Sequence, residues 1–138
     1  MISVIIADDH NLVRECKRAL LEKAEDIIVV GEAENGEQAV ELVQEKQPDV
    51  LVMDIAMPGM NGIQVLEKLR ETVLPTQVVI LSMYADEIFV RQALQNGAKG
   101  YLLKGSFKEE LLLTIRAASR GATYLSPTVS ETALTSPS

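Results

Sequence analysis

The chain alternates between two hydrophobic patterns, and it does so five times. Short runs of consecutive Val, Ile and Leu are typical of strands buried on both faces, and each run here is followed by apolar residues at helical spacing. The strand-like runs are 2–7, 27–30, 50–53, 78–81 and 100–103. The helical segments cover 12–24, the stretch from 36 to just before Pro48, 63–69, 88–94 and 111–120.

This alternation restricts the fold class. Strands that alternate with helices form a parallel sheet with helices on both faces, because the crossover between parallel strands is right-handed. Five such units are too few for a closed eight-stranded barrel. The sequence therefore predicts an α/β fold in three α/β/α layers, with five helices around an open, doubly wound, five-stranded parallel sheet. The common strand order for such a sheet is 2-1-3-4-5.

Composition narrows the class of protein. The 138 residues carry a formal net charge of −7, with 47% hydrophobic residues and a single cysteine. This balance is that of one globular domain, and it argues against direct binding to nucleic acid or to an anionic membrane. One cysteine cannot form an internal disulfide, which fits a reducing, cytoplasmic location. Cys16 shares a helical stripe with Leu12, Ala19 and Leu20, so we expect it in the core.

The last thirteen residues differ from the rest. Nine of the residues 126–138 are Ser, Thr or Pro, and only Glu131 is charged. This composition predicts a linker or a chain end and not a packed element. We therefore expect one domain over 1–125, followed by a linker over 126–138.

Reactive side chains follow four of the five predicted strands. Asp8 and Asp9 follow the first, Asp54 the third, Ser82 the fourth and Lys104 the fifth. In an open parallel sheet these carboxyl ends share one edge, and ligands bind where the strand order reverses. We therefore expect the three carboxylates to converge. The alternative for the Asp8-Asp9 pair is a helix N-cap.

Three carboxylates in one crevice repel one another unless protons or a cation compensate. Their hard oxygen ligands favour Mg²⁺ or Mn²⁺ over zinc or copper. With a hydroxyl from Ser82 and an ammonium from Lys104, the set suits phosphoryl transfer to one carboxylate. His10 is the only histidine, and we expect it to be an ordinary loop residue.

Four blocks of sequence resemble one known family. They are IADDH at 6–10, VMDIAMPGMNG at 52–62, LSMY at 81–84 and GAKGYLLK at 97–104. In this order and at these strand ends, they resemble the receiver domain of two-component response regulators over about residues 1–125. The last block, with GATYLS at 121–126, is similar to the NarL/FixJ subfamily. The resemblance implies the flavodoxin-like (CheY-like) version of the predicted fold.

The resemblance also implies roles for individual residues. Asp54 matches the phosphoacceptor. The Mg²⁺ ligands would be Asp9 directly, Asp8 through water, Asp54 itself and the backbone carbonyl of Ala56. Lys104 matches the lysine that contacts the phosphoryl group.

The remaining matched positions form a conformational switch. Ser82 and Tyr101 match the pair in which the hydroxyl moves toward the new phosphoryl group and the ring swings inward behind it. A packing role for the Tyr101 ring is the alternative. Gly105 stands where receivers often have a cis proline, and a cis bond without proline costs about 2.5–4 kcal/mol, which leaves the isomer of the Lys104–Gly105 bond open. Ala56 and Tyr84 flank the expected path of an attacking water.

The implied function is a switch in a phosphorelay that catalyses only its own phosphorylation and dephosphorylation. The phosphoryl donor would be a phosphohistidine on a sensor histidine kinase, and the output would be transcription control through a helix-turn-helix domain outside this chain. DNA would be bound only through that domain. A homodimer on phosphorylation is expected either through the first and last helices or through the fourth helix, fifth strand and fifth helix. Two alternatives are a Mg²⁺-dependent phosphohydrolase and a flavin-binding module of the same fold.

Overall fold

The computed structural model describes residues 1–72, 75–83, 87–103, 108–126 and 129. Its strands are β1 (Ile2–Ala7), β2 (Ile27–Ala33), β3 (Val50–Asp54), β4 (Gln77–Ser82), β5 (Gly100–Leu103) and β6 (Tyr124–Leu125). Its helices are α1 (Asn11–Glu22), α2 (Gly36–Lys46), α3 (Gly62–Arg70), α4 (Glu87–Gln95) and α5 (Lys108–Ser119). The five predicted strand–helix units are thus confirmed.

All the strand pairs are parallel, in the order β2-β1-β3-β4-β5-β6. The predicted order 2-1-3-4-5 is confirmed, but the predicted number of strands is wrong, because β6 adds a sixth strand beside β5. Tyr124 N–H donates to the carbonyl of Lys99 at 2.9 Å, and Ser126 N–H donates to the carbonyl of Tyr101 at 3.2 Å. A two-residue strand is too short to give a recognisable pattern.

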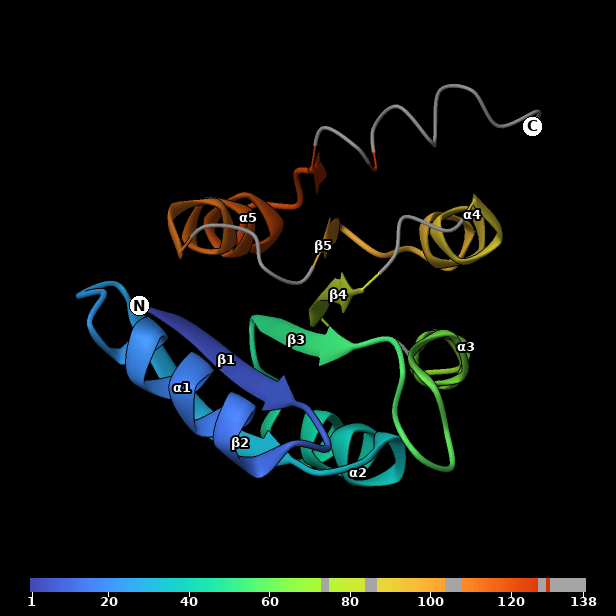
Figure 1. The fold of residues 1–138 in the computed structure, drawn as a ribbon, viewed down its shortest axis with the longest axis horizontal. Helices are drawn as coiled ribbons and strands as arrows, with labels where there is room; N and C mark the ends of the chain where they lie inside the picture. The colour runs from blue at the N-terminus through green and yellow to red at the C-terminus, as the bar shows by residue number, and fades with distance from the viewer. Residues whose placement is uncertain (73–74, 84–86, 104–107, 127–128, 130–138) are drawn as a thin grey trace.

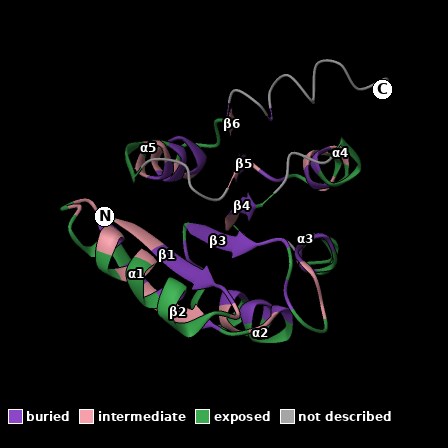
Figure 2. Cartoon of the chain, viewed as in Figure 1, coloured by how far each residue is buried: buried purple, intermediate pink, exposed green. Residues whose placement is uncertain are grey.

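The sheet separates two hydrophobic cores, and helices α1 and α5 lie on one face while α2, α3 and α4 lie on the other (Figure 1). The first core contains Leu21 of α1 and Ile115 of α5. The second contains Val43 of α2, Val65 of α3 and Val90 of α4. The central strands β3 and β4 are almost entirely buried between the two helical layers (Figure 2), as their continuous apolar runs predict. The edge strand β2 is only partly buried.

Helix α1 is rotated away from the predicted orientation. Leu12 is 73% exposed and Cys16 is exposed, so the expectation of a core cysteine is wrong. The buried positions of α1 are Arg14 and Leu21. The physical reason is electrostatic: the N-terminal half of the helix presents Arg14 and Lys17 to the acidic strand ends and leaves Leu12 and Cys16 in solvent.

The boundary at 125 remains a prediction. Among the residues after it that the structure describes, Ser126 and Val129 are buried, and Val129 belongs to the core under α2, α3 and α4. Packing therefore continues a few residues past β6.

Candidate functional site

Three carboxylates meet where β1 and β3 end, at the same edge of the sheet. Asp54 is the last residue of β3, and Asp8 and Asp9 directly follow β1, its neighbour in the sheet. Ligand atoms of Asp8, Asp9, His10 and Asp54 all lie within 4.8 Å of one another. The predicted convergence of Asp8, Asp9 and Asp54, here called the carboxylate cluster, is therefore present.

The cluster is partly enclosed. Asp8 and Asp54 are buried, whereas the side chain of Asp9 is 29% exposed. Backbone donors fix the two buried carboxylates: His10 N–H donates to Asp8 Oδ1 at 2.9 Å, and Ala56 N–H donates to Asp54 Oδ1 at 3.1 Å. Each of these two carboxylates is therefore hydrogen-bonded to the backbone of the loop that follows its own strand.

The helix after Asp8-Asp9 does not use either side chain as its cap. The N-cap residue of α1 is His10, and it makes no side-chain capping hydrogen bond. The N-cap alternative for the aspartate pair is therefore wrong.

The loop after Asp54 is fixed by its junction with α3. Asn61 caps α3 with a reciprocal capping box to Gln64, and Gly62 N–H donates to the carbonyl of Ile55 at 2.9 Å. A Cβ on Gly62 would lie 2.8 Å from Ile55 Cα, closer than Cβ atoms are found. The helix can approach the end of β3 this closely only because residue 62 is glycine.

The oxygen ligands fit a hard divalent cation. Asp9 Oδ1 is enclosed, yet it accepts no hydrogen bond from the part of the chain that the structure describes. A buried, charged oxygen without a donor is unfavourable unless a cation neutralises it. Carboxylate oxygens are the ligands that a hard divalent cation such as Mg²⁺ prefers.

His10 lies closer to the cluster than the sequence indicates. Its Nδ1 is 3.1 Å from Asp9 Oδ1 and 3.4 Å from Asp8 Oδ1, although its side chain is 65% exposed. The expectation of an ordinary loop residue misses this contact. The position directly after the two aspartates was the available signal.

Two basic side chains of α1 contact Asp8, and sequence reasoning missed both. Lys17 Nζ lies 2.6 Å from Asp8 Oδ2, and Arg14 Nη1 donates to the backbone carbonyl of Asp8 at 2.7 Å. Arg14 also donates to Glu32 at 3.1 Å. Basic residues three positions apart on the helix after an acidic pair were the signal that could have found them.

The other predicted site residues lie on the neighbouring strands. Ser82 is the last residue of β4 and is buried; the preceding residue, Leu81, is paired with Asp54. Tyr101 on β5 is fully buried in the core under α2, α3 and α4, so its ring is packed inside the domain. Lys104, Gly105 and Tyr84 lie outside the described residues, and so does the Lys104–Gly105 bond.

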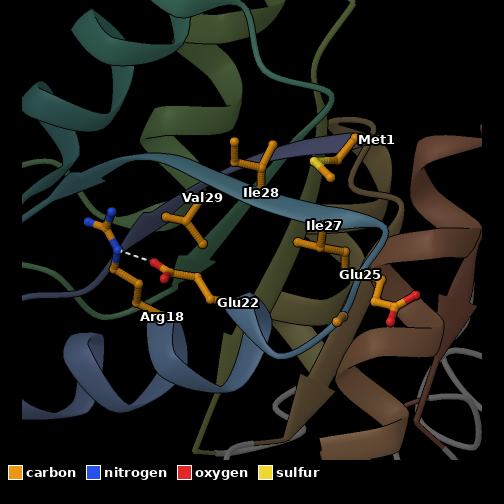
Figure 3. A pocket seen from close by; sticks show the side chains of 8 residues that line it. Met1, Arg18, Glu22, Glu25, Ile27, Ile28 and Val29 are labelled. Carbon is orange, nitrogen blue, oxygen red and sulfur yellow. Dashed lines mark hydrogen bonds and ion pairs between the residues drawn. The ribbon is translucent and has the colours of Figure 1, made fainter.

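A separate hollow of about 430 Å³ lies at the opposite end of the strands. Figure 3 shows it between the end of α1, where Arg18 pairs with Glu22, and the first residues of β2. It shares no lining residue with the carboxylate cluster. The two places are therefore independent.

A doubly wound sheet in this order, with carboxylates at the ends of β1 and β3, defines a receiver-type α/β domain. The family model described as the response regulator receiver domain matches residues 4–116. The chain belongs to that family.

Relatives place the chain within the family. It is 42% identical over 125 residues to the oxygen regulatory protein NreC of Staphylococcus haemolyticus, covering 90% of this chain and 58% of that protein. It is 41% identical over 124 residues to the nitrate/nitrite response regulator NarL of Escherichia coli K12, covering 90% and 57%. The chain thus spans less than two thirds of the length of these curated relatives.

A solved structure agrees with this placement. The signal receiver domain of NarL from Mycobacterium tuberculosis superposes with a TM-score of 0.84 at 40% identity, covering 87% of this chain and 97% of that one. The chain is therefore a receiver domain of the NarL/LuxR type of two-component response regulator. This excludes the flavin-binding alternative as the family of this chain.

Proposed function

We propose that Asp54 accepts a phosphoryl group and that the acyl phosphate switches the domain between two conformations. The observation that carries this proposal is the cluster of Asp8, Asp9 and Asp54 within 4.8 Å at one sheet edge. A carboxylate oxygen of Asp54 attacks the phosphorus, the bond from phosphorus to the donor nitrogen breaks, and that nitrogen keeps the electron pair. Water later attacks the acyl phosphate and releases inorganic phosphate.

Each remaining site residue has a task in this proposal. Asp9 and Asp8, together with Asp54 and the carbonyl of Ala56, would hold Mg²⁺. When bound, the ion would neutralise charge on the phosphoryl oxygens. Ser82 would donate a hydrogen bond to one of these oxygens, and Lys104 would contact another. Tyr101 would report the switch through its ring, which is fully buried in this structure.

Exposed apolar side chains near the cluster support a protein as the phosphoryl donor. Leu12 and Val13 lie in the first turn of α1, directly after the cluster loop, and are 73% and 41% exposed. Apolar side chains in solvent beside a reactive site favour docking of a macromolecule. A sensor histidine kinase that presents a phosphohistidine meets this requirement.

Further partners belong to the whole protein. DNA would be bound by an output domain beyond the linker over 126–138, and the domain over 1–125 would control it in the cytoplasm. No helix among the described residues is long and apolar enough to cross a membrane. A dimer on phosphorylation could use either face named above, since Leu113 on α5 and Phe89 on α4 are both exposed. Analytical ultracentrifugation with and without beryllofluoride would test it.

The test of the proposed function uses acetyl phosphate and Mg²⁺. We expect intact-protein mass spectrometry to show one added phosphoryl group, and Asp54→Asn to remove it. Glu71→Gln is the control, because it removes an exposed carboxylate outside the cluster. Continuous hydrolysis of phosphate esters over many turnovers would instead establish the phosphohydrolase, and labelling of Asp54→Asn would overturn the assignment.

A further inference from the structure

The face of α1 that packs on the sheet is apolar at Leu21 but basic in its N-terminal half, where a helix of this kind would ordinarily also be apolar. Arg14 is buried, the side chain of Lys17 is 14% exposed, and both lie against the end of β1. These side chains lie one turn apart on the helix. The acidic edge of the sheet thus has a basic lining built into the same domain.

Lys17 differs from Arg14 in what it contacts. Arg14 binds the carbonyl of Asp8, the side chain of Asn11 and Glu32, and none of these is a carboxylate of the cluster. Lys17 Nζ lies 2.6 Å from Oδ2 of Asp8, whose side chain is fully buried. An ion pair enclosed in this way is stronger than one in solvent, because water screens it less.

This contact occupies the carboxylate that a divalent ion needs. A metal held by Asp9 and Asp54, with Asp8 as its third carboxylate, would bring two positive charges close to the ammonium. Two cations in one enclosed site repel each other, and the carboxylate oxygen has to divide its interaction between them.

We propose that Lys17 is an internal counter-ion that stabilises Asp8 in the metal-free domain and competes with Mg²⁺ for it. The proposal rests on the metal site of the proposed function and adds a residue that sets its affinity. Lys17 lowers the repulsion within the cluster when no ion is bound. Metal binding then has to weaken or displace the Lys17–Asp8 pair, so the domain binds Mg²⁺ less tightly than its three carboxylates alone would.

The test measures Mg²⁺ binding directly by isothermal titration calorimetry on Lys17→Met and Lys17→Gln. We expect each variant to bind Mg²⁺ about tenfold more tightly than the natural chain, because a nearby positive charge is gone. Without Mg²⁺ each should unfold at a lower temperature, and saturating Mg²⁺ should narrow that difference. Lys68→Met is the matched control: it removes an exposed lysine paired with Glu71 at 3.3 Å and should leave Mg²⁺ affinity unchanged.

A second measurement does not depend on a variant that folds. In the natural chain, the NMR signal of the Lys17 ammonium should shift on addition of Mg²⁺, while that of Lys68 stays in place. Unchanged or weaker Mg²⁺ binding by the Lys17 variants, or an unmoved Lys17 signal in a chain that binds Mg²⁺, overturns the proposal. Absence of Mg²⁺ binding by both natural chain and variants would overturn the metal site of the proposed function itself.

Discussion

Arg116 of α5 forms a bidentate ion pair with Asp26, which lies in the loop between α1 and β2. Nε and Nη2 donate to the two carboxylate oxygens at 2.8 and 2.9 Å. The two residues are 90 positions apart, so the pair ties the last helix to the first strand–helix unit. Bidentate pairing of this kind fixes orientation as well as charge.

The Asp26–Arg116 pair predicts a pH-dependent stability. Hydrogen bonding to Arg116 holds the pKa of Asp26 below its ordinary value of 3.8. A lowered pKa in the folded state means that the contribution is fully present above about pH 4 and is lost as the pH falls through the lowered value. We expect Asp26→Asn to unfold at a lower temperature than the natural chain at pH 7, and we expect this difference to shrink as the pH falls below about 4. Thermal denaturation of both proteins between pH 7 and low pH measures the difference in unfolding temperature. A difference that stays the same across this pH range would contradict a contribution from the Asp26–Arg116 pair.

The contact of Gly62 with the backbone after Asp54 predicts a local steric effect of substitution. Gly62→Ala should lower the free energy of unfolding by about 1–3 kcal/mol, because the added Cβ meets the backbone of Ile55. Gly31→Ala is the control, since a Cβ there would lie 3.5 Å from Ile5, an ordinary contact. Urea denaturation of the two variants measures the difference. Equal stability of Gly62→Ala and the natural chain would show that α3 can move away from the end of β3.

The exposed side chain of Leu12 predicts that its substitution affects a sensor kinase and acetyl phosphate differently as phosphoryl donors. Leu12→Ser should slow phosphorylation by a sensor kinase about tenfold, because it removes an apolar docking contact. Labelling by acetyl phosphate should be unchanged, since Leu12 contributes nothing to the carboxylate cluster. Ile28→Ser is the control, as Ile28 is 46% exposed on the edge strand β2. Equal loss with both donors would place Leu12 in the chemistry instead of in docking.

The position of His10 beside Asp9 predicts that its substitution affects the binding of Ni²⁺ and Mg²⁺ differently. An imidazole nitrogen 3.1 Å from Asp9 Oδ1 suits Ni²⁺ better than Mg²⁺ or Mn²⁺, which prefer oxygen ligands. His10→Ala should weaken Ni²⁺ binding roughly tenfold while leaving Mg²⁺ binding unchanged. Calorimetric titration with each metal measures it. A parallel loss of both would mean that His10 supports the loop and not the ion.

The sequence predicts the sheet better than it predicts the orientation of the first helix. Strand order and the meeting of Asp8 with Asp54 follow from buried apolar runs and from the shared edge of parallel strands. The rotation of α1 does not follow from hydrophobic pattern, because Arg14 and Lys17 face the sheet while Leu12 and Cys16 face solvent. There the neutralisation of buried carboxylates outweighs the burial of two small apolar surfaces.

The proposed counter-ion role of Lys17 could not be predicted from the sequence, for the same reason. Pattern analysis places a residue on a strand, helix or loop, but an ion pair depends on the angle between two elements. Once the acidic end of β1 is known to be buried, the basic residues of the next helix become its expected partners.

The pairing of β6 with β5 connects the backbone of Tyr101 directly to the residues that follow α5. Residues 124–126 are hydrogen-bonded along the same strand that carries Tyr101, and Ser126 is attached to the carbonyl of Tyr101 itself. Any shift of that tyrosine's backbone therefore moves the point from which the rest of the chain departs. A rearrangement of β5 would thus be passed to Ser126 through a backbone hydrogen bond, without any side chain in between.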